Sequence, residues 1–233
     1  NIERMTQDAM ERAEHVRALL GKDKLILVGH SWGTLLGWRA MKSRPEVFHA
    51  FVATGMFVGW ARMLPIQEAY ARAQAEAAGD AAAIAALDAV RDLPPDDFAR
   101  AQPTRRFLMS PSDLDYLRNV QGTFLGNGAP LPETGDVHDW VQGGATTMTA
   151  PQILPSFLQY DAYALGLEGD IPVAVIQGRD DMVTPVEPAR QFVEELSAPD
   201  KSFTLIDGGH FACFTNPDGF VAALLEYVRP FAV

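Results

Sequence analysis

Cysteine is almost absent from this 233-residue chain, whose single example is Cys213. One thiol excludes an internal disulfide and a metal site built from several thiolates. Long apolar runs are absent too, since none approaches the roughly 20 residues that a helix needs to cross a bilayer. Basic residues number 19 against 30 acidic ones, for a net charge of −11. Phosphate backbones and anionic lipid would repel such a chain, so we expect neither nucleic acid nor a membrane as a partner.

The chain also lacks an initiator methionine and begins with Asn1, already inside a helical pattern. We therefore expect a segment upstream of this sequence. We predict a cytoplasmic location, with a removed signal peptide as the alternative. No Gly-rich phosphate loop occurs, and the acidic and histidine residues do not fall at metal-ligand spacings. We predict no metal and no organic cofactor.

What is present is concentrated in residues 24–33. Residues 24–28, apolar after Lys24, read as a fully buried strand. Gly29-His30-Ser31-Trp32-Gly33 follows it, and a helical pattern runs from Thr34 to about Met41. A strand, a serine between glycines and a helix, in that order, are typical of a nucleophile elbow. We predict strained backbone at Ser31. We also expect that a side chain at Gly29 or Gly33 would collide with the crossing strand or helix.

Helices and strands alternate on both sides of this stretch. Apolar residues at spacings of three and four predict an amphipathic helix over 2–20, capped by Gly21. The other core elements that we expect are strands over 49–54, 171–176 and 202–206 and helices over 187–196 and 217–228. This order predicts an α/β fold with a doubly wound, mostly parallel sheet.

The stretch between about 56 and 170 has a different character. Its patterns predict alanine-rich helices over 61–78 and 81–90 and a helix from an N-cap at Ser112 to Asn119, with no convincing strand. We interpret this stretch as a mostly helical insertion that lies over the elbow.

A serine nucleophile needs a base, and the base needs a group that orients it. In doubly wound sheets, working residues gather at the carboxyl ends of strands. Ser31 follows one strand, His210 follows another in a Gly-rich loop, and Asp180 and Asp181 both follow the strand over 171–176. The residues therefore predict Ser31 as nucleophile, His210 as base and one of the two aspartates as the orienting acid.

For the other histidines we expect structural rather than catalytic roles. They are His15 on a helix face, His30 in packing or lining a pocket, His49 at a strand start and His138 in the insertion.

Three segments carry a resemblance: Gly29 to Gly33, Gly178-Arg179-Asp180-Asp181-Met182-Val183-Thr184-Pro185, and Gly208-Gly209-His210. Together they resemble the α/β-hydrolase superfamily, and more closely its proline iminopeptidase-like branch. This resemblance places the catalytic acid on Asp181. It also implies a hydrolase core over 1–58 and 168–233, interrupted by a helical cap over 59–167.

The resemblance further implies an oxyanion hole, to which the backbone N–H of Trp32 would donate. The family places the second donor, with several strands, upstream of the helix where this sequence starts. We therefore expect the chain to be the C-terminal portion of a longer enzyme, with the strand over 24–28 left as an apolar edge.

These residues predict a serine hydrolase that works through an acyl-enzyme on Ser31. The resemblance favours release of an N-terminal, prolyl-type residue from a short peptide. The alternatives are a carboxylesterase for small apolar esters, and a catalytically incomplete fragment or binding module. A serine nucleophile argues against an epoxide hydrolase, which uses a carboxylate. The carboxylates of Glu68, Asp115 and Glu133 could receive a substrate ammonium, although each is equally consistent with a solvated surface.

Overall fold

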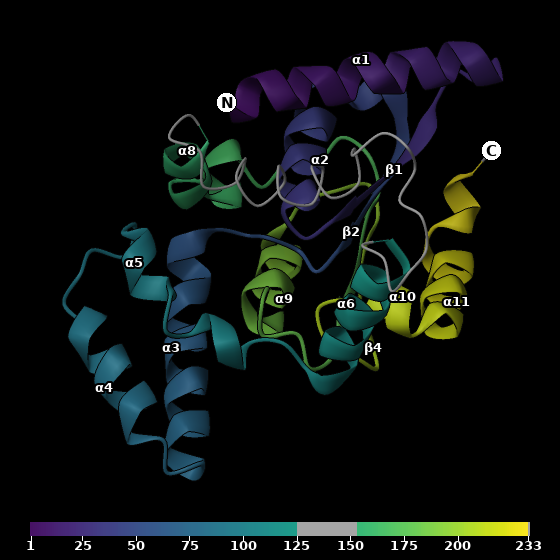
Figure 1. Ribbon diagram of the computed structural model, residues 1–233. Coiled ribbons are helices and arrows are strands. Elements are labelled where there is room, and N and C mark those ends of the chain that lie inside the picture. Colours follow the sequence, from purple (N-terminus) through teal and green to yellow (C-terminus); the bar gives the residue numbers. More distant parts are fainter. Residues whose placement is uncertain (125–152, 233) are drawn as a thin grey trace.

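The computed structural model describes residues 1–124 and 153–232 (Figure 1). Its strands are β1 (Leu25–His30), β2 (Phe48–Thr54), β3 (Val173–Gly178) and β4 (Lys201–Ile206). They form a parallel sheet in the order β1-β2-β3-β4. The α-helices are α1 (Ile2–Leu20), α2 (Trp32–Ser43), α3 (Trp60–Ala77), α4 (Ala81–Val90), α5 (Phe98–Ala101), α6 (Pro111–Phe124), α8 (Leu154–Leu158), α9 (Val186–Glu195), α10 (Ala212–Thr215) and α11 (Pro217–Tyr227). Short 3₁₀ turns are η1 (Pro45–Val47), η2 (Arg105–Phe107), η3 (Ala162–Leu165) and η4 (Arg229–Phe231).

Apolar cores cover both faces of the sheet. Phe51 and Val175 belong to the larger core, on the face where α2 and α9 pack. Val52 and Ile176, each one residue along in its strand, belong to a second core with α10 and α11. A parallel sheet buried on both faces by helices is the arrangement predicted from the sequence.

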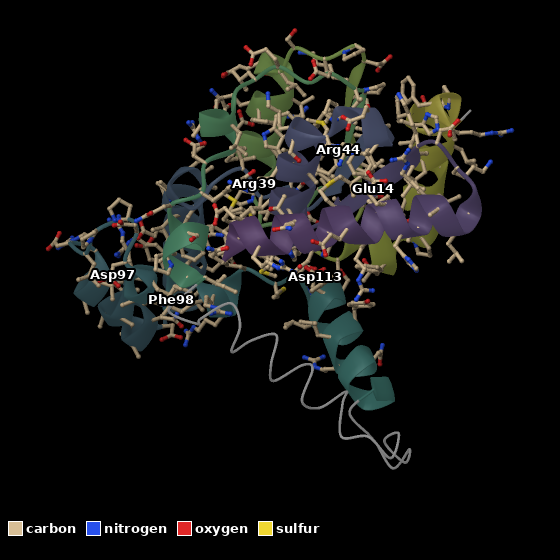
Figure 2. All side chains as sticks on the ribbon, turned by 90° about the horizontal axis from the view of Figure 1, so that it is seen from above. Glu14, Arg39, Arg44, Asp97, Phe98 and Asp113 are labelled. Carbon is tan, nitrogen blue, oxygen red and sulfur yellow. The ribbon has the colours of Figure 1, made fainter. Side chains whose placement is uncertain are left out.

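Helix α1 is held across α2 by charged pairs as well as by apolar packing. Arg39 of α2 pairs with Glu3 at 3.1 Å, and Arg44, just after α2, pairs with Glu14 at 2.8 Å (Figure 2). Gly21 ends α1 in a left-handed conformation with φ of 61°, as predicted.

Strand β1 departs from the prediction of full burial. Among the described residues it pairs with β2 alone, and Val28 is 53% exposed. Val28 lies beside Val52 in the register, on the face that α10 and α11 cover mainly over β3 and β4. The prediction of a fully buried strand is therefore wrong, whereas the expected apolar edge is present.

The segment between β2 and β3, here called the β2–β3 insertion (residues 55–172), carries α3 to α6, α8 and η3. Figure 1 shows α3, α4 and α5 extending together away from the sheet. As predicted, its described residues are mostly helical, and none of the four strands of the sheet lies among them. Across the described ranges, no helix is both long and apolar enough to span a membrane.

The start of α6 corrects one prediction. Ser112 lies within its first turn, and the N-cap is Ser110, whose hydroxyl accepts the amide of Asp113 at 3.2 Å. Pro111 fits the first helical position because its missing N–H is not needed there. The short helices α5 and α10 were not predicted, since four residues carry too little periodicity to show.

The two glycines of the elbow differ in their surroundings. A Cβ built on Gly29 would lie 2.8 Å from the carbonyl oxygen of Gly33 and 3.0 Å from Thr34 Cα. A Cβ on Gly33 would meet none of the described atoms within 4 Å. The predicted collision is confirmed for Gly29 and wrong for Gly33, because β1 and α2 close upon each other only at Gly29.

We expect Gly29→Ala to lower the free energy of unfolding by about 1–3 kcal/mol, since the added methyl overlaps backbone that cannot turn away. Gly33→Ala is the matched control, and we expect it to leave stability unchanged or to raise it by up to about 1 kcal/mol through helix propensity. Urea unfolding of both variants followed by circular dichroism checks this. Equal losses at the two positions would contradict it.

Candidate active site

Ser31 lies on the turn between β1 and α2 with φ of 54° and ψ of −130°. Among the described non-glycine residues, Ser31 alone has a positive φ. Its amide donates to the Thr54 carbonyl at 2.9 Å, and its own carbonyl accepts the Thr34 hydroxyl at 2.6 Å. These bonds from β2 and α2 hold a backbone conformation that costs free energy, as the prediction of strain requires.

His210 lies between Ser31 and Asp181. Its Nε2 is 2.8 Å from Ser31 Oγ, and its Nδ1 is 3.0 Å from Asp181 Oδ2. When Nδ1–H donates to the carboxylate, Nε2 is free to accept the serine proton, which is the tautomer a general base needs. The three predicted side chains thus come together from the loops that follow β1, β3 and β4.

Asp181 is buried at 1% exposure, and protein donors surround both of its oxygens. Oδ1 accepts the amides of Val183 at 3.0 Å and Thr184 at 2.8 Å. Oδ2 accepts the Thr184 hydroxyl at 2.8 Å and Gln177 Nε2 at 2.9 Å. These bonds satisfy the buried carboxylate and fix its orientation toward His210. Asp180, by contrast, is exposed.

Gln177 and Thr184 are site residues that the sequence analysis missed. Gln177 is buried at the end of β3, where its amide nitrogen also donates to the Thr184 carbonyl at 2.7 Å. Its amide oxygen accepts the Met56 amide at 3.0 Å. A glutamine closing an apolar run was the available signal for this position, and the loop motif already contained Thr184.

His30 is placed in packing and is not among the described residues that line the cavity. Its Nδ1 is 2.9 Å from Thr54 Oγ1, and its ring centroid is 4.9 Å from that of His210. Burial, assisted by the neighbouring His210 and opposed by Asp181, lowers the pKa of His30 from 6.5 to about 4. Near neutral pH, His30 therefore adds no positive charge beside the imidazolium that His210 forms as a base.

The lowered pKa of His30 predicts an acid sensitivity. Between about pH 6.5 and pH 4 the unfolded chain binds a proton at His30 that the folded chain does not, so stability falls as the pH falls through this window. We expect His30→Asn to lose less stability than the parent between pH 6.5 and 4.5, measured by urea unfolding at each pH. Replacing the exposed His15 by Asn is the control for the loss of one imidazole from the chain. A parent-like profile for the His30 variant would contradict the prediction.

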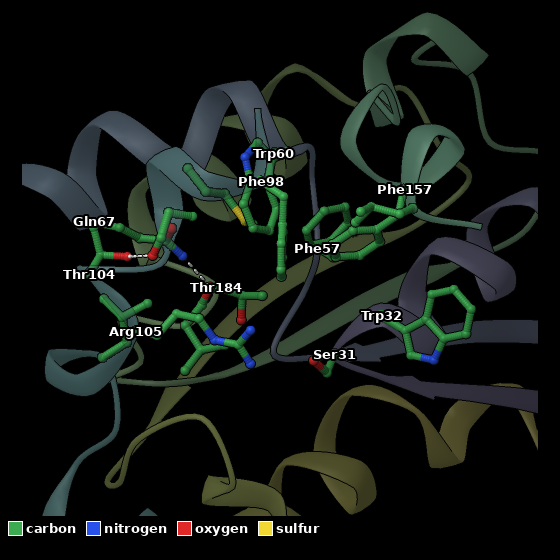
Figure 3. Close-up of a pocket in the computed structure, with 15 residues that line it drawn as sticks. Ser31, Trp32, Phe57, Trp60, Gln67, Phe98, Thr104, Arg105, Phe157 and Thr184 are labelled. Atoms are coloured by element: carbon green, nitrogen blue, oxygen red, sulfur yellow. Dashed lines mark hydrogen bonds between the residues drawn. The ribbon is translucent and has the colours of Figure 1, made fainter. Parts of the chain in front are cut away.

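A cavity of about 270 Å³ opens beside Ser31 (Figure 3). Its walls are largely aromatic and aliphatic and come mainly from the β2–β3 insertion. The described lining residues are Ser31, Trp32, Phe57, Trp60, Met63, Gln67, Phe98, Ala101, Thr104, Arg105, Leu108, Leu154, Phe157, Val183 and Thr184. Arg105 is the one charged side chain among them, and Figure 3 shows it reaching toward Ser31.

Trp32 is the first residue of α2 and lines the same cavity. The first amides of a helix have no acceptor within the helix, and the helix dipole is positive at this end. The backbone N–H of Trp32 is thus suited to the oxyanion role predicted for it.

Neither Glu68 nor Asp115 is among the described lining residues of the cavity. Each pairs with an arginine, Glu68 with Arg100 at 2.6 Å and Asp115 with Arg118 at 2.6 Å. His15 is exposed and His49 lies partly buried in β2, as expected for histidines without a catalytic role. Glu133 and His138 lie outside the described residues.

Comparison with known proteins agrees with the observed fold. Residues 3–217 match the family model described as alpha/beta hydrolase fold, and the chain belongs to this family. It is 21% identical over 242 residues to a protein of Bacillus subtilis (strain 168) named Probable aminopeptidase YbaC, a match that spans 98% of this chain and 72% of that protein.

Two solved structures illustrate the shared fold. A proline iminopeptidase of Mycobacterium smegmatis has a TM-score of 0.52 at 17% identity and is matched over 93% of this chain and 68% of its own. A thermophilic esterase has a TM-score of 0.58 at 17% identity and is matched over 97% of this chain and 73% of its own. At such identities the likeness shows the fold alone.

Proposed function

We propose that this protein is a serine hydrolase that cleaves carboxylic esters through an acyl-enzyme on Ser31. The observation that carries the proposal is the continuous contact from Ser31 Oγ through His210 to Asp181, with steps of 2.8 and 3.0 Å, beside an apolar cavity. A hydroxyl, an imidazole and a carboxylate in this arrangement are the parts that acyl transfer needs.

In this reaction His210 Nε2 takes the Ser31 proton as Oγ attacks the substrate carbonyl, and then gives it to the leaving alcohol. Asp181 stabilises the imidazolium and keeps Nδ1 protonated. The amide of Trp32 and the N-terminus of α2 stabilise the negative charge on the carbonyl oxygen. Water, activated by the same imidazole, then releases the acid.

The cavity supports an apolar, aromatic or branched group on the substrate. Phe57, Trp60, Phe98 and Phe157 line it and bury apolar surface well. Because the β2–β3 insertion supplies most of these walls, we propose that it acts as the substrate-binding cap. Aminopeptidase action on a prolyl-type residue is the second candidate, supported by the name of the Bacillus subtilis relative.

Ser31→Ala should lower kcat for a short-chain aryl ester by at least about 10⁴-fold, because no other group supplies the nucleophile. The same variant should lose labelling by a fluorophosphonate probe, which reports an activated serine. Ser43→Ala is the matched control, since Ser43 is an exposed serine whose hydroxyl bonds the Ala40 carbonyl at the far end of α2. Turnover retained by the Ser31 variant would rule out the acyl-enzyme.

Arg105 allows a test that distinguishes an ester substrate from an aminopeptidase substrate. Its guanidinium repels a substrate ammonium in the cavity, so we expect a neutral aryl ester to be preferred over a prolyl arylamide. Arg105→Gln should raise kcat/KM for the prolyl arylamide by about fivefold relative to the ester. This is the size of effect expected when a positive charge that repels the substrate ammonium is removed from a partly solvated site. Arg106→Gln is the control, because Arg106 pairs with Asp80 and is not among the described lining residues. A wild-type preference for the prolyl substrate would favour the aminopeptidase instead.

A further inference from the structure

Asp113 is a buried carboxylate that the proposed chemistry does not use. It lies in the first turn of α6, within the β2–β3 insertion, and is 0% exposed. Its Oδ2 accepts the backbone amide of His210 at 2.9 Å, and its Oδ1 accepts the backbone amide of Phe211 at 2.8 Å. A carboxylate carried by the insertion therefore holds the main chain at the histidine of the active site.

The same carboxylate also begins α6. Its Oδ2 accepts the amide of Ser110 at 3.1 Å and the Ser110 hydroxyl at 2.8 Å, and that hydroxyl accepts the Asp113 amide at 3.2 Å. This is a capping box with aspartate in the third position. The carboxylate bonds of the box both go to Oδ2, so the bonds from the amides of His210 and Phe211 are additional to what the helix start requires.

The contact between α6 and the histidine loop leaves no room for a Cβ at position 209 unless the Asp113 side chain moves. A Cβ on Gly209 would lie 2.0 Å from Asp113 Oδ2. A Cβ on Gly178, at the end of β3, would lie 1.9 Å from the Gly209 carbonyl oxygen. The backbone just before His210 thus packs closely against both the end of β3 and the start of α6.

Aromatic packing extends this contact along α6. Tyr116, one turn after Asp113, lies against Phe211 with ring centroids 5.2 Å apart. It also stacks on Phe214, at 5.4 Å and an interplanar angle of 5°. In Figure 2, Asp113 is labelled where α6 approaches the rest of the fold.

We propose that Asp113 is a positioning residue of the hydrolase reaction, which fixes the His210 backbone so that the imidazole reaches Ser31 and Asp181 together. This inference rests on the proposed function. The two amides point from a buried loop, where unpaired donors are costly, and a carboxylate binds them more strongly than a neutral acceptor does. Placement matters because a shift of about 1 Å at a reacting group can cost about 100-fold in rate.

The test compares Asp113→Asn with Ser110→Ala. Asparagine keeps the shape but has one accepting oxygen, so it must abandon the amide of His210 or that of Phe211. Ser110→Ala weakens the capping box and leaves both loop amides bonded to Asp113. We expect the Asp113 variant to lose about 10- to 100-fold in kcat on an aryl ester with KM within threefold, and to react with the fluorophosphonate probe correspondingly more slowly. The Ser110 variant should keep kcat within threefold at a similar loss of thermal stability.

A spectroscopic measurement separates positioning from stability. The downfield proton resonance of His210 Nδ1–H should shift or broaden in folded Asp113→Asn and stay in place in Ser110→Ala. If Asp113→Asn does not fold, Gly209→Ala disturbs the same contact from the loop side and should show the same kcat loss.

Equal kcat losses in the Asp113 and Ser110 variants, or a parent-like kcat for Asp113→Asn, would overturn the proposal. So would failure of both the Asp113 and the Gly209 variants to fold while Ser110→Ala folds, since the contact would then serve stability alone. A wild-type protein that neither hydrolyses the ester nor labels at Ser31 would instead refute the proposed function, a result distinguishable from all of these.

Discussion

The left-handed backbone of Ser31 is the constraint around which the rest of the structure is arranged. A non-glycine residue at φ of 54° persists only where its surroundings determine it from several sides. Here β2 supplies the acceptor for its amide, and Thr34 supplies a donor for its carbonyl. The Thr34 hydroxyl also accepts the amide of Phe57 at 2.9 Å, at the start of the β2–β3 insertion. The turn is therefore fastened to the sheet, to α2 and to the insertion at once.

The polar groups behind His210 form a buried hydrogen-bonded network centred on Asp181, Gln177 and Thr184. Gln177 joins the Asp181 carboxylate and the Thr184 carbonyl, both in the loop after β3, to the Met56 amide at the start of the β2–β3 insertion. Such networks specify one arrangement when all members are satisfied, and they are costly when one member is lost. The neutral His30 completes this electrostatic setting, because a second imidazolium so near His210 would oppose proton transfer to it.

The sequence could predict what local patterns encode. A strand, Gly-x-Ser-x-Gly and a helix identified Ser31, and the positions of His210 and the Asp180–Asp181 pair followed from chain order. The elements of the core were predicted to within a few residues for the same reason. The exposure of Val28 and the open space at Gly33 could not be predicted, since both depend on which helices reach which strand. Asp113 was missed because its partners lie 97 and 98 residues away, and the capping pattern at Ser110 explains only half of its bonds.

The shared use of Asp113 has a consequence for redesign of this protein. Segments inserted between core strands are attractive places to graft a foreign specificity, because they wall the cavity while the sheet carries the reacting groups. In this chain, lining the cavity and holding the reacting groups are not separable at the first turn of α6. There the Asp113 carboxylate accepts the backbone amides of His210 and Phe211. A chimaera that exchanged α3 to α5 could leave the imidazole undisturbed. One that also replaced α6 would need a new acceptor for those donors.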